Sequence, residues 1–107
     1  MRLDVIVEDQ VFPVEVPEDL LAEAEAFFQR MDADMDRGWQ VGREWVERPD
    51  TVVRCQIAAD RLLTALHTDN EAMKVMMAAY ILARMPGTRA VHVDTAGNPL
   101  DTEFVSG

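Results

Sequence analysis

The segment from Glu71 to Met85, EAMKVMMAAYILARM, is apolar on almost every side. Its only charged residues are Glu71, Lys74 and Arg84, and a Pro-Gly pair follows it directly. A helix without a polar face is stable in water only where other elements cover it. The segment therefore predicts a central helix, packed between other elements or in a subunit interface, and the rest of the chain has to build that cover.

Both ends of the chain have the alternating pattern of β-hairpins. In the opening LDVIVEDQVFPVEVP, apolar residues at every second position flank the polar EDQ. Pro13 cannot donate a hydrogen bond to a neighbouring strand, so its strand is predicted to lie at a sheet edge. The tail RAVHVDTAGNPLDTEFV predicts a second hairpin around AGNP. Its inward-facing residues are expected to be Val91, Val93, Leu100 and Phe104.

Three helices are predicted between the hairpins. From Pro17 to Arg48 an apolar stripe recurs at helical spacing over roughly 30 residues, and Pro49 ends it, which indicates one long helix. A second helix is expected from the N-cap Asp50 to His67, and the apolar segment forms the third. The predicted fold is α+β, with a single domain covering residues 1–107.

The stretch DADMDRGWQVGREW, residues 32–45, resembles the front of an EF-hand calcium loop. That loop needs glycine at its sixth position and glutamate at its twelfth, whereas counting from Asp32 gives Arg37 and Arg43. The apolar stripe also keeps its phase through the segment. We therefore interpret the three aspartates as a solvated helix face without a bound ion.

Two glycines in this stretch predict a close contact. Gly38 and Gly42 form G-x-x-x-G beside the apolar stripe, and two glycines inside a helix cost on the order of 2 kcal/mol relative to alanine. Close approach of another backbone, from the central helix or a partner chain, would offset that cost. Tryptophan is enriched in interface anchors, although core packing is the alternative role for both tryptophans. The interaction candidates are Met35, Gly38, Trp39, Gly42 and Trp45.

A polar cluster is expected on the tail hairpin. Pairing of Val91 with Phe104 would place His92 opposite Glu103 and Asp94 opposite Asp101. Facing like charges are unfavourable, so a cation or a basic partner group would relieve the repulsion. A hydrated sheet face is the alternative.

Charge and cysteine content restrict the partners and the compartment. Ten Lys and Arg against twenty Asp and Glu give a net charge of −10, which argues against direct binding to nucleic acid or to an anionic membrane surface. Cys55 has no disulfide partner, the opening residues do not form a signal peptide, and no apolar run is long enough to span a bilayer. We expect a cytoplasmic protein without a membrane segment.

Converging catalytic groups are scarce. Cys55 lies on the apolar stripe of its predicted helix, and the chain has no H-E-x-x-H motif and no Gly-rich phosphate loop. No catalytic, cofactor-binding or metal-binding residue is assigned. The leading hypothesis is a non-enzymatic adaptor or accessory protein that acts through helix packing, as a homodimer or with another protein. Alternatives are a metal-responsive or metal-carrying protein, an acidic mimic of nucleic acid that binds a basic protein, and an enzyme whose site is completed across a dimer.

Overall fold

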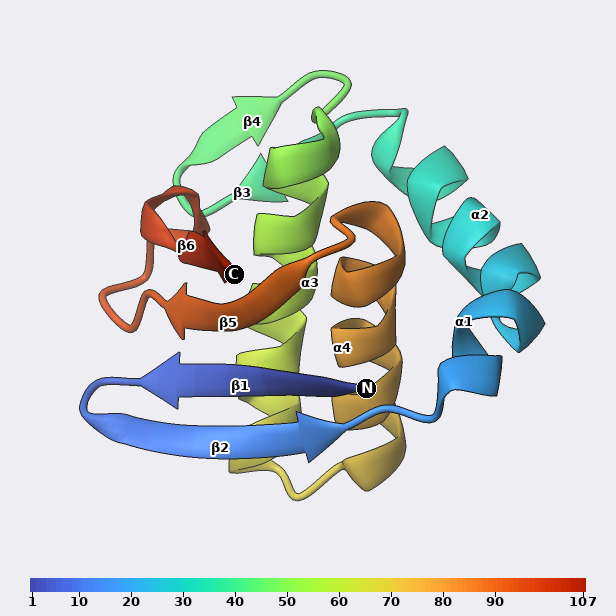
Figure 1. Ribbon diagram of the computed structural model, residues 1–107. Helices are drawn as coiled ribbons and strands as arrows, with labels where there is room; N and C mark the ends of the chain where they lie inside the picture. Colours follow the sequence, from blue (N-terminus) through green and yellow to red (C-terminus); the bar gives the residue numbers. More distant parts are fainter.

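The computed structural model describes residues 1–107, and it places a four-stranded sheet in front of the helix pair α3 and α4 (Figure 1). The strand order in the sheet is β2-β1-β5-β6, so the hairpins from the two ends of the chain join in one sheet. Pairing is antiparallel within each hairpin and parallel between β1 and β5. The strands are β1 (Arg2–Val7), β2 (Gln10–Glu15), β5 (Thr88–Val93) and β6 (Glu103–Ser106).

The N-terminal hairpin confirms the prediction from the alternating pattern. Leu3 and Val5 are fully buried, and across the hairpin Leu3 pairs with Val14. Pro13 lies in β2, which is an edge strand, so its missing backbone N–H breaks no interior ladder. The residues between these apolar positions are at least partly exposed, because no helix covers the outer face of the sheet (Figure 1).

The long first helix was a wrong prediction. The segment forms α1 (Glu18–Glu23) and α2 (Glu25–Met35), followed by a separate two-stranded sheet of β3 (Trp39–Val41) and β4 (Glu44–Val46). Gly38 and Gly42 have φ angles of +95° and +60°, which a right-handed helix excludes and which glycine adopts at low cost. The two glycines therefore build turns on either side of β3, and the predicted helical contact through them does not exist.

The last two helices begin where capping residues were available. Helix α3 (Thr51–His67) is capped by Asp50, whose Oδ1 accepts a hydrogen bond of 2.9 Å from the backbone N–H of Val53, as predicted. Helix α4 (Glu71–Arg84) is capped in the same way by Asn70. The apolar segment is thus the fourth helix. Its second half is buried without interruption from residue 77 to residue 82, whereas its first half is partly exposed.

The C-terminal hairpin has the predicted register but a longer connection. Val91 pairs with Phe104 and His92 with Glu103. Between the strands the chain forms a 3-10 turn, η1 (Pro99–Asp101), so Asp94 and Asp101 lie outside the strands and do not face each other across a ladder. No helix of the protein combines the length and the apolar character needed to cross a membrane.

Candidate functional site

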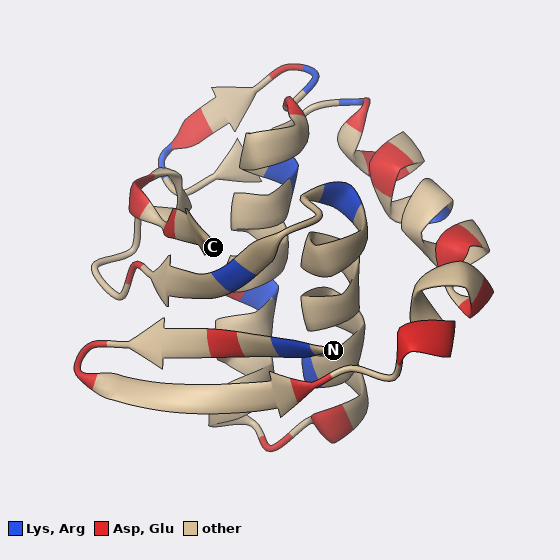
Figure 2. Ribbon diagram, viewed as in Figure 1, with Lys and Arg blue, Asp and Glu red and all other residues tan.

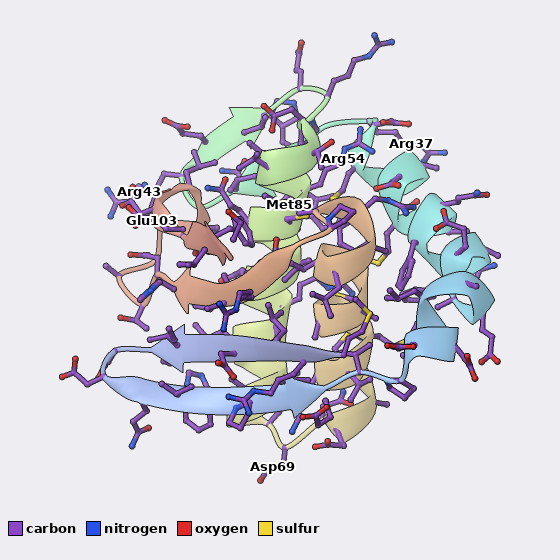
Figure 3. All side chains as sticks on the ribbon, viewed as in Figure 1. Arg37, Arg43, Arg54, Asp69, Met85 and Glu103 are labelled. Atoms are coloured by element: carbon purple, nitrogen blue, oxygen red, sulfur yellow. The ribbon has the colours of Figure 1, made fainter.

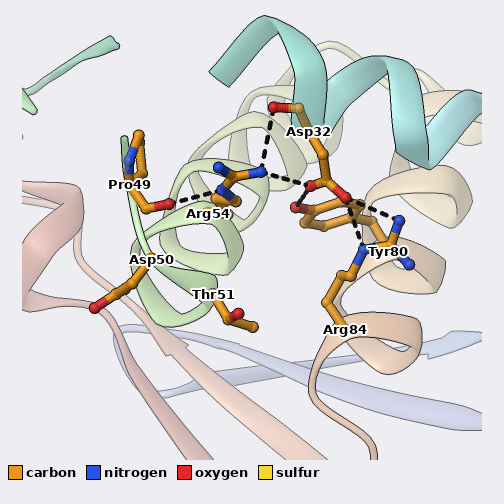
Figure 4. Close-up of a pocket in the computed structure, with 7 residues that line it drawn as sticks. All are labelled: Asp32, Pro49, Asp50, Thr51, Arg54, Tyr80 and Arg84. Carbon is orange, nitrogen blue, oxygen red and sulfur yellow. Dashed lines mark hydrogen bonds and ion pairs between the residues drawn. The ribbon is translucent and has the colours of Figure 1, made fainter. Parts of the chain in front are cut away.

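A polar cavity of about 260 Å³ lies between α2, the start of α3 and the end of α4 (Figure 4). The residues that line it come from three separate parts of the chain. They are Asp32, Pro49, Asp50, Thr51, Arg54, Tyr80 and Arg84. Two arginines, a phenol and a carboxylate so close together make this cavity the strongest candidate for chemistry, so its hydrogen bonding decides what it can do.

Asp32 occupies the centre of the cluster. Its Oδ1 accepts a hydrogen bond from the Tyr80 hydroxyl, and its Oδ2 accepts one of 3.0 Å from Nε of Arg84. Nη1 of Arg54 lies 3.4 Å from Oδ1. The carboxylate of one helix, α2, is therefore held by side chains of the two helices beside it. Its role differs from the solvated helix face that the sequence predicted.

Each arginine is bound by several groups of the protein itself. Arg84 also donates two hydrogen bonds of 2.9 Å to the carboxylate oxygens of Glu25. Arg54 donates from Nε to the carbonyl oxygen of Pro49 at 2.7 Å, and from its terminal nitrogens to the Asp32 carbonyl oxygen and the Asp36 carboxylate. No buried side-chain nitrogen or oxygen in the protein lacks a hydrogen-bond partner. Both guanidinium groups are therefore already paired with carboxylates of the protein.

The pKa values follow from these contacts and from burial. The hydrogen bond from Arg84 lowers the pKa of Glu25, and the same contact raises the pKa of Arg84. Burial, followed by the hydrogen bond to Asp32, raises the pKa of the Tyr80 phenol. Burial raises the pKa of Cys55 to about 12. At neutral pH the Glu25–Arg84 pair stays charged, while the phenol and the thiol stay protonated, so neither is an activated nucleophile.

We call Glu25, Asp32, Asp36, Arg54, Tyr80 and Arg84 together the ion-pair junction. It fixes α2 to α3 and α4 through long side chains, alongside apolar packing of Phe28, whose ring meets that of Tyr80 edge to face at 5.7 Å. Sequence reasoning missed it. A usable signal was present, because Arg54 and Arg84 are isolated charges in apolar stretches, and a charge in such a place needs a partner.

Four of the five predicted interaction candidates lie in or directly beside the β3–β4 hairpin rather than on a helix stripe. Met35 is buried at the end of α2, and Trp39 is half-buried. Trp45 is 59% exposed, the largest exposed fraction among the large hydrophobic residues. Its indole lies directly over Gly38, where an added Cβ would be 2.5 Å from Cζ2 of the ring. Gly42 lies instead near the Gly97 carbonyl oxygen.

The predicted polar cluster of the tail comes together only in part. His92 and Glu103 are cross-strand neighbours. The Asp94 carboxylate accepts hydrogen bonds from the backbone N–H groups of Ala96 at 3.1 Å and Asn98 at 2.8 Å, so it stabilises the connecting loop. Asp101 is reached only by the Asn98 amide, at 3.4 Å. No three His, Cys, Asp or Glu side chains are arranged to hold a metal ion.

Comparison with known proteins adds no relative: no protein-family model matches the chain, and no curated protein or solved structure is significantly similar to it.

Proposed function

We propose that the chain is a non-enzymatic accessory protein that acts by binding protein, and that a second copy of the chain binds at the β3–β4 hairpin. The observation that carries this proposal is the exposed indole of Trp45, which packs over Gly38. The ion-pair junction supports the non-enzymatic part, because its donors and acceptors are engaged in holding helices together.

Trp45 is suited to be an anchor. Tryptophan is among the residues that contribute most to binding when buried at an interface. The glycine beneath the indole removes the side chain that would collide with the ring, so the exposed ring is supported from below. A supported side chain loses less conformational entropy on binding than a free one.

Local charge favours a second copy as the occupant. Residues 37–48 contain three arginines and two glutamates, a net charge of +1, so the rest of the chain carries −11. Figure 2 shows this contrast, because both colours surround the hairpin whereas α1 and the β1–β2 turn carry acidic residues only. Two strongly acidic chains repel each other, and the hairpin is a face where that repulsion is small.

Strand pairing supplies a second reason. The β3–β4 sheet has only two strands and is not joined to the main sheet. A two-stranded sheet has unpaired backbone groups along both edges, and it gains stability when more strands are added. Val41 of β3 is buried, whereas Trp45 of β4 is exposed, so β4 is the strand that a second copy would approach. Such a contact around a twofold axis closes into a dimer.

Light scattering at micromolar concentration tests the dimer. The wild-type protein should have about twice the chain mass of 12.1 kDa and should dissociate on dilution. Trp45→Ala should be monomeric, whereas Val11→Ala, which truncates a residue of similar exposure on β2, should remain dimeric. A wild-type monomer would contradict the proposal. An acidic mimic of nucleic acid would use the remaining acidic surface, and its binding to a basic protein would survive Trp45→Ala.

A further inference from the structure

A groove of about 470 Å³ lies between the tip of the β1–β2 hairpin and the connection from α3 to α4. This volume falls within the range of small-molecule sites. The groove is remote from the hairpin of the proposed dimer. Figure 3 shows Asp69, on its rim, at the opposite end of the molecule from Arg37 and Arg43.

The floor of the groove is apolar. Four side chains from two strands and one helix form it, and each packs against the core while remaining partly exposed. They are Val7, Phe12, Leu63 and Leu66. These side chains remain partly exposed, so an apolar occupant would remove their exposed surface from water.

The rim of the groove selects the charge of the occupant. Glu8 and Asp69 lie on it, and neither side chain has an ion-pair or hydrogen-bond partner in the protein. Lys74 is the one basic residue with a permanent charge on the rim, and its ammonium is 2.7 Å from the carboxylate of Glu71. The charges of Glu8, Asp69, Lys74 and its partner Glu71 add up to a net negative charge, and the chain as a whole carries −10. An anion is therefore disfavoured at this rim.

We propose that this groove binds a small organic cation, an ammonium or guanidinium group on a short apolar body. The body contacts the floor, and the cationic head lies at the rim, where the Glu8 and Asp69 carboxylates favour a positive charge. Lys74 does not oppose this arrangement strongly, because Glu71 neutralises it. The proposal is independent of the dimer, because none of the residues of β3 or β4 lines the groove.

Three probes with one body and different heads test the charge selection. 4-Phenylbutylamine, 4-phenylbutanol and 4-phenylbutyrate are titrated separately into the full chain labelled with nitrogen-15, and backbone amide shifts are followed by NMR. The amine should shift the amides of Gln10, Leu66 and Asp69 and should saturate. The alcohol should bind more weakly at the same place, and the carboxylate most weakly of all.

Variants then test the two carboxylates. Glu8→Gln and Asp69→Asn should each weaken amine binding about two- to fivefold, as expected for a solvent-exposed ion pair, and should leave alcohol binding unchanged. Asparagine tolerates the positive φ of residue 69, so that turn is preserved. Asp9→Asn, next to Glu8 but outside the groove, is the matched control and should bind like the wild type. The proposal is overturned if the carboxylate binds as tightly as the amine, if all three variants behave alike, or if the shifts map elsewhere.

Discussion

Replacing Asp32 by asparagine should destabilise the protein more than any other single change of an acidic residue on α2. The amide keeps one acceptor oxygen but loses the charge, and its NH2 group then faces guanidinium or phenol donors. Tyr80 and Arg84 both donate to the carboxylate in the native state. Arg54 and Arg84 would remain mostly buried beside a neutral group, with side-chain exposures of 17% and 21%.

The size of the loss in the free energy of unfolding follows from these contacts. A hydrogen bond to a charged group contributes roughly 1.5–3 kcal/mol, and breaking a fully buried pair costs roughly 3–5 kcal/mol. Because the groups here retain some solvent contact, we expect a loss of about 2–4 kcal/mol in the free energy of unfolding. With an unfolding entropy of about 2.1 cal/mol/K per residue, the melting temperature should fall by roughly 9–18 °C.

Urea denaturation and calorimetry measure this loss. Asp34→Asn is the matched control, because Asp34 is an exposed acid on the same helix whose side chain has no hydrogen-bond or ion-pair partner, and it should change stability by less than about 0.5 kcal/mol. Tyr80→Phe removes one donor and no charge, so its effect should lie between the two. If Asp32→Asn and Asp34→Asn melt alike, the ion-pair junction does not hold α2 in place and the reasoning fails.

Two further predictions concern pKa values. Burial raises the pKa of Cys55 to about 12, so a thiol reagent at neutral pH should label the native protein far more slowly than the unfolded protein; fast native labelling would refute the buried position. Burial, followed by repulsion from Asp94, raises the pKa of Asp60 in the folded state. The folded state therefore binds this proton more tightly than the unfolded state does. The free energy of unfolding is highest below the unfolded pKa and falls as pH rises through the folded pKa, where Asp60 becomes charged. Asp60→Asn should raise the melting temperature at neutral pH and have no effect below about pH 3, where the unfolded carboxyl is also protonated. An equal change in melting temperature at both pH values would show that the raised pKa of Asp60 is not its cause.

The hairpins and α3 could be predicted because their signals are local. Alternation of period two specified the register of Val91 with Phe104, and Asp50 after a proline marked the start of α3. The error between residues 17 and 48 has a physical cause. Short helices followed by short strands can place apolar residues at spacings that also fit one long helix, and the sequence does not state the φ of a glycine. The helical penalty of Gly38 and Gly42 was itself the evidence for turns.

The ion-pair junction could not be assembled from the sequence, because its members are spread from Glu25 to Arg84 and pair only through the tertiary fold. Isolated charges such as Arg54 indicate that a partner exists, but they do not identify it. Likewise, the exposure of Trp45 depends on which side of β4 faces the core. Spacing along one chain fixes neighbours within an element, whereas packing between elements decides which polar groups meet.

The parallel pair β1–β5 sets the order in which the chain can fold during synthesis. Asp4 pairs with Ala90, so β1 can complete its pairing only after a strand that is synthesised 86 positions later. At ribosomal rates of about 5–20 residues per second this delay is roughly 4–17 s. The β1–β2 hairpin can form early, but β1 then has an open edge until β5 arrives. The central ladder of the sheet is therefore completed after nearly all of these residues have been synthesised, and the nascent hairpin is the species most exposed to mispairing.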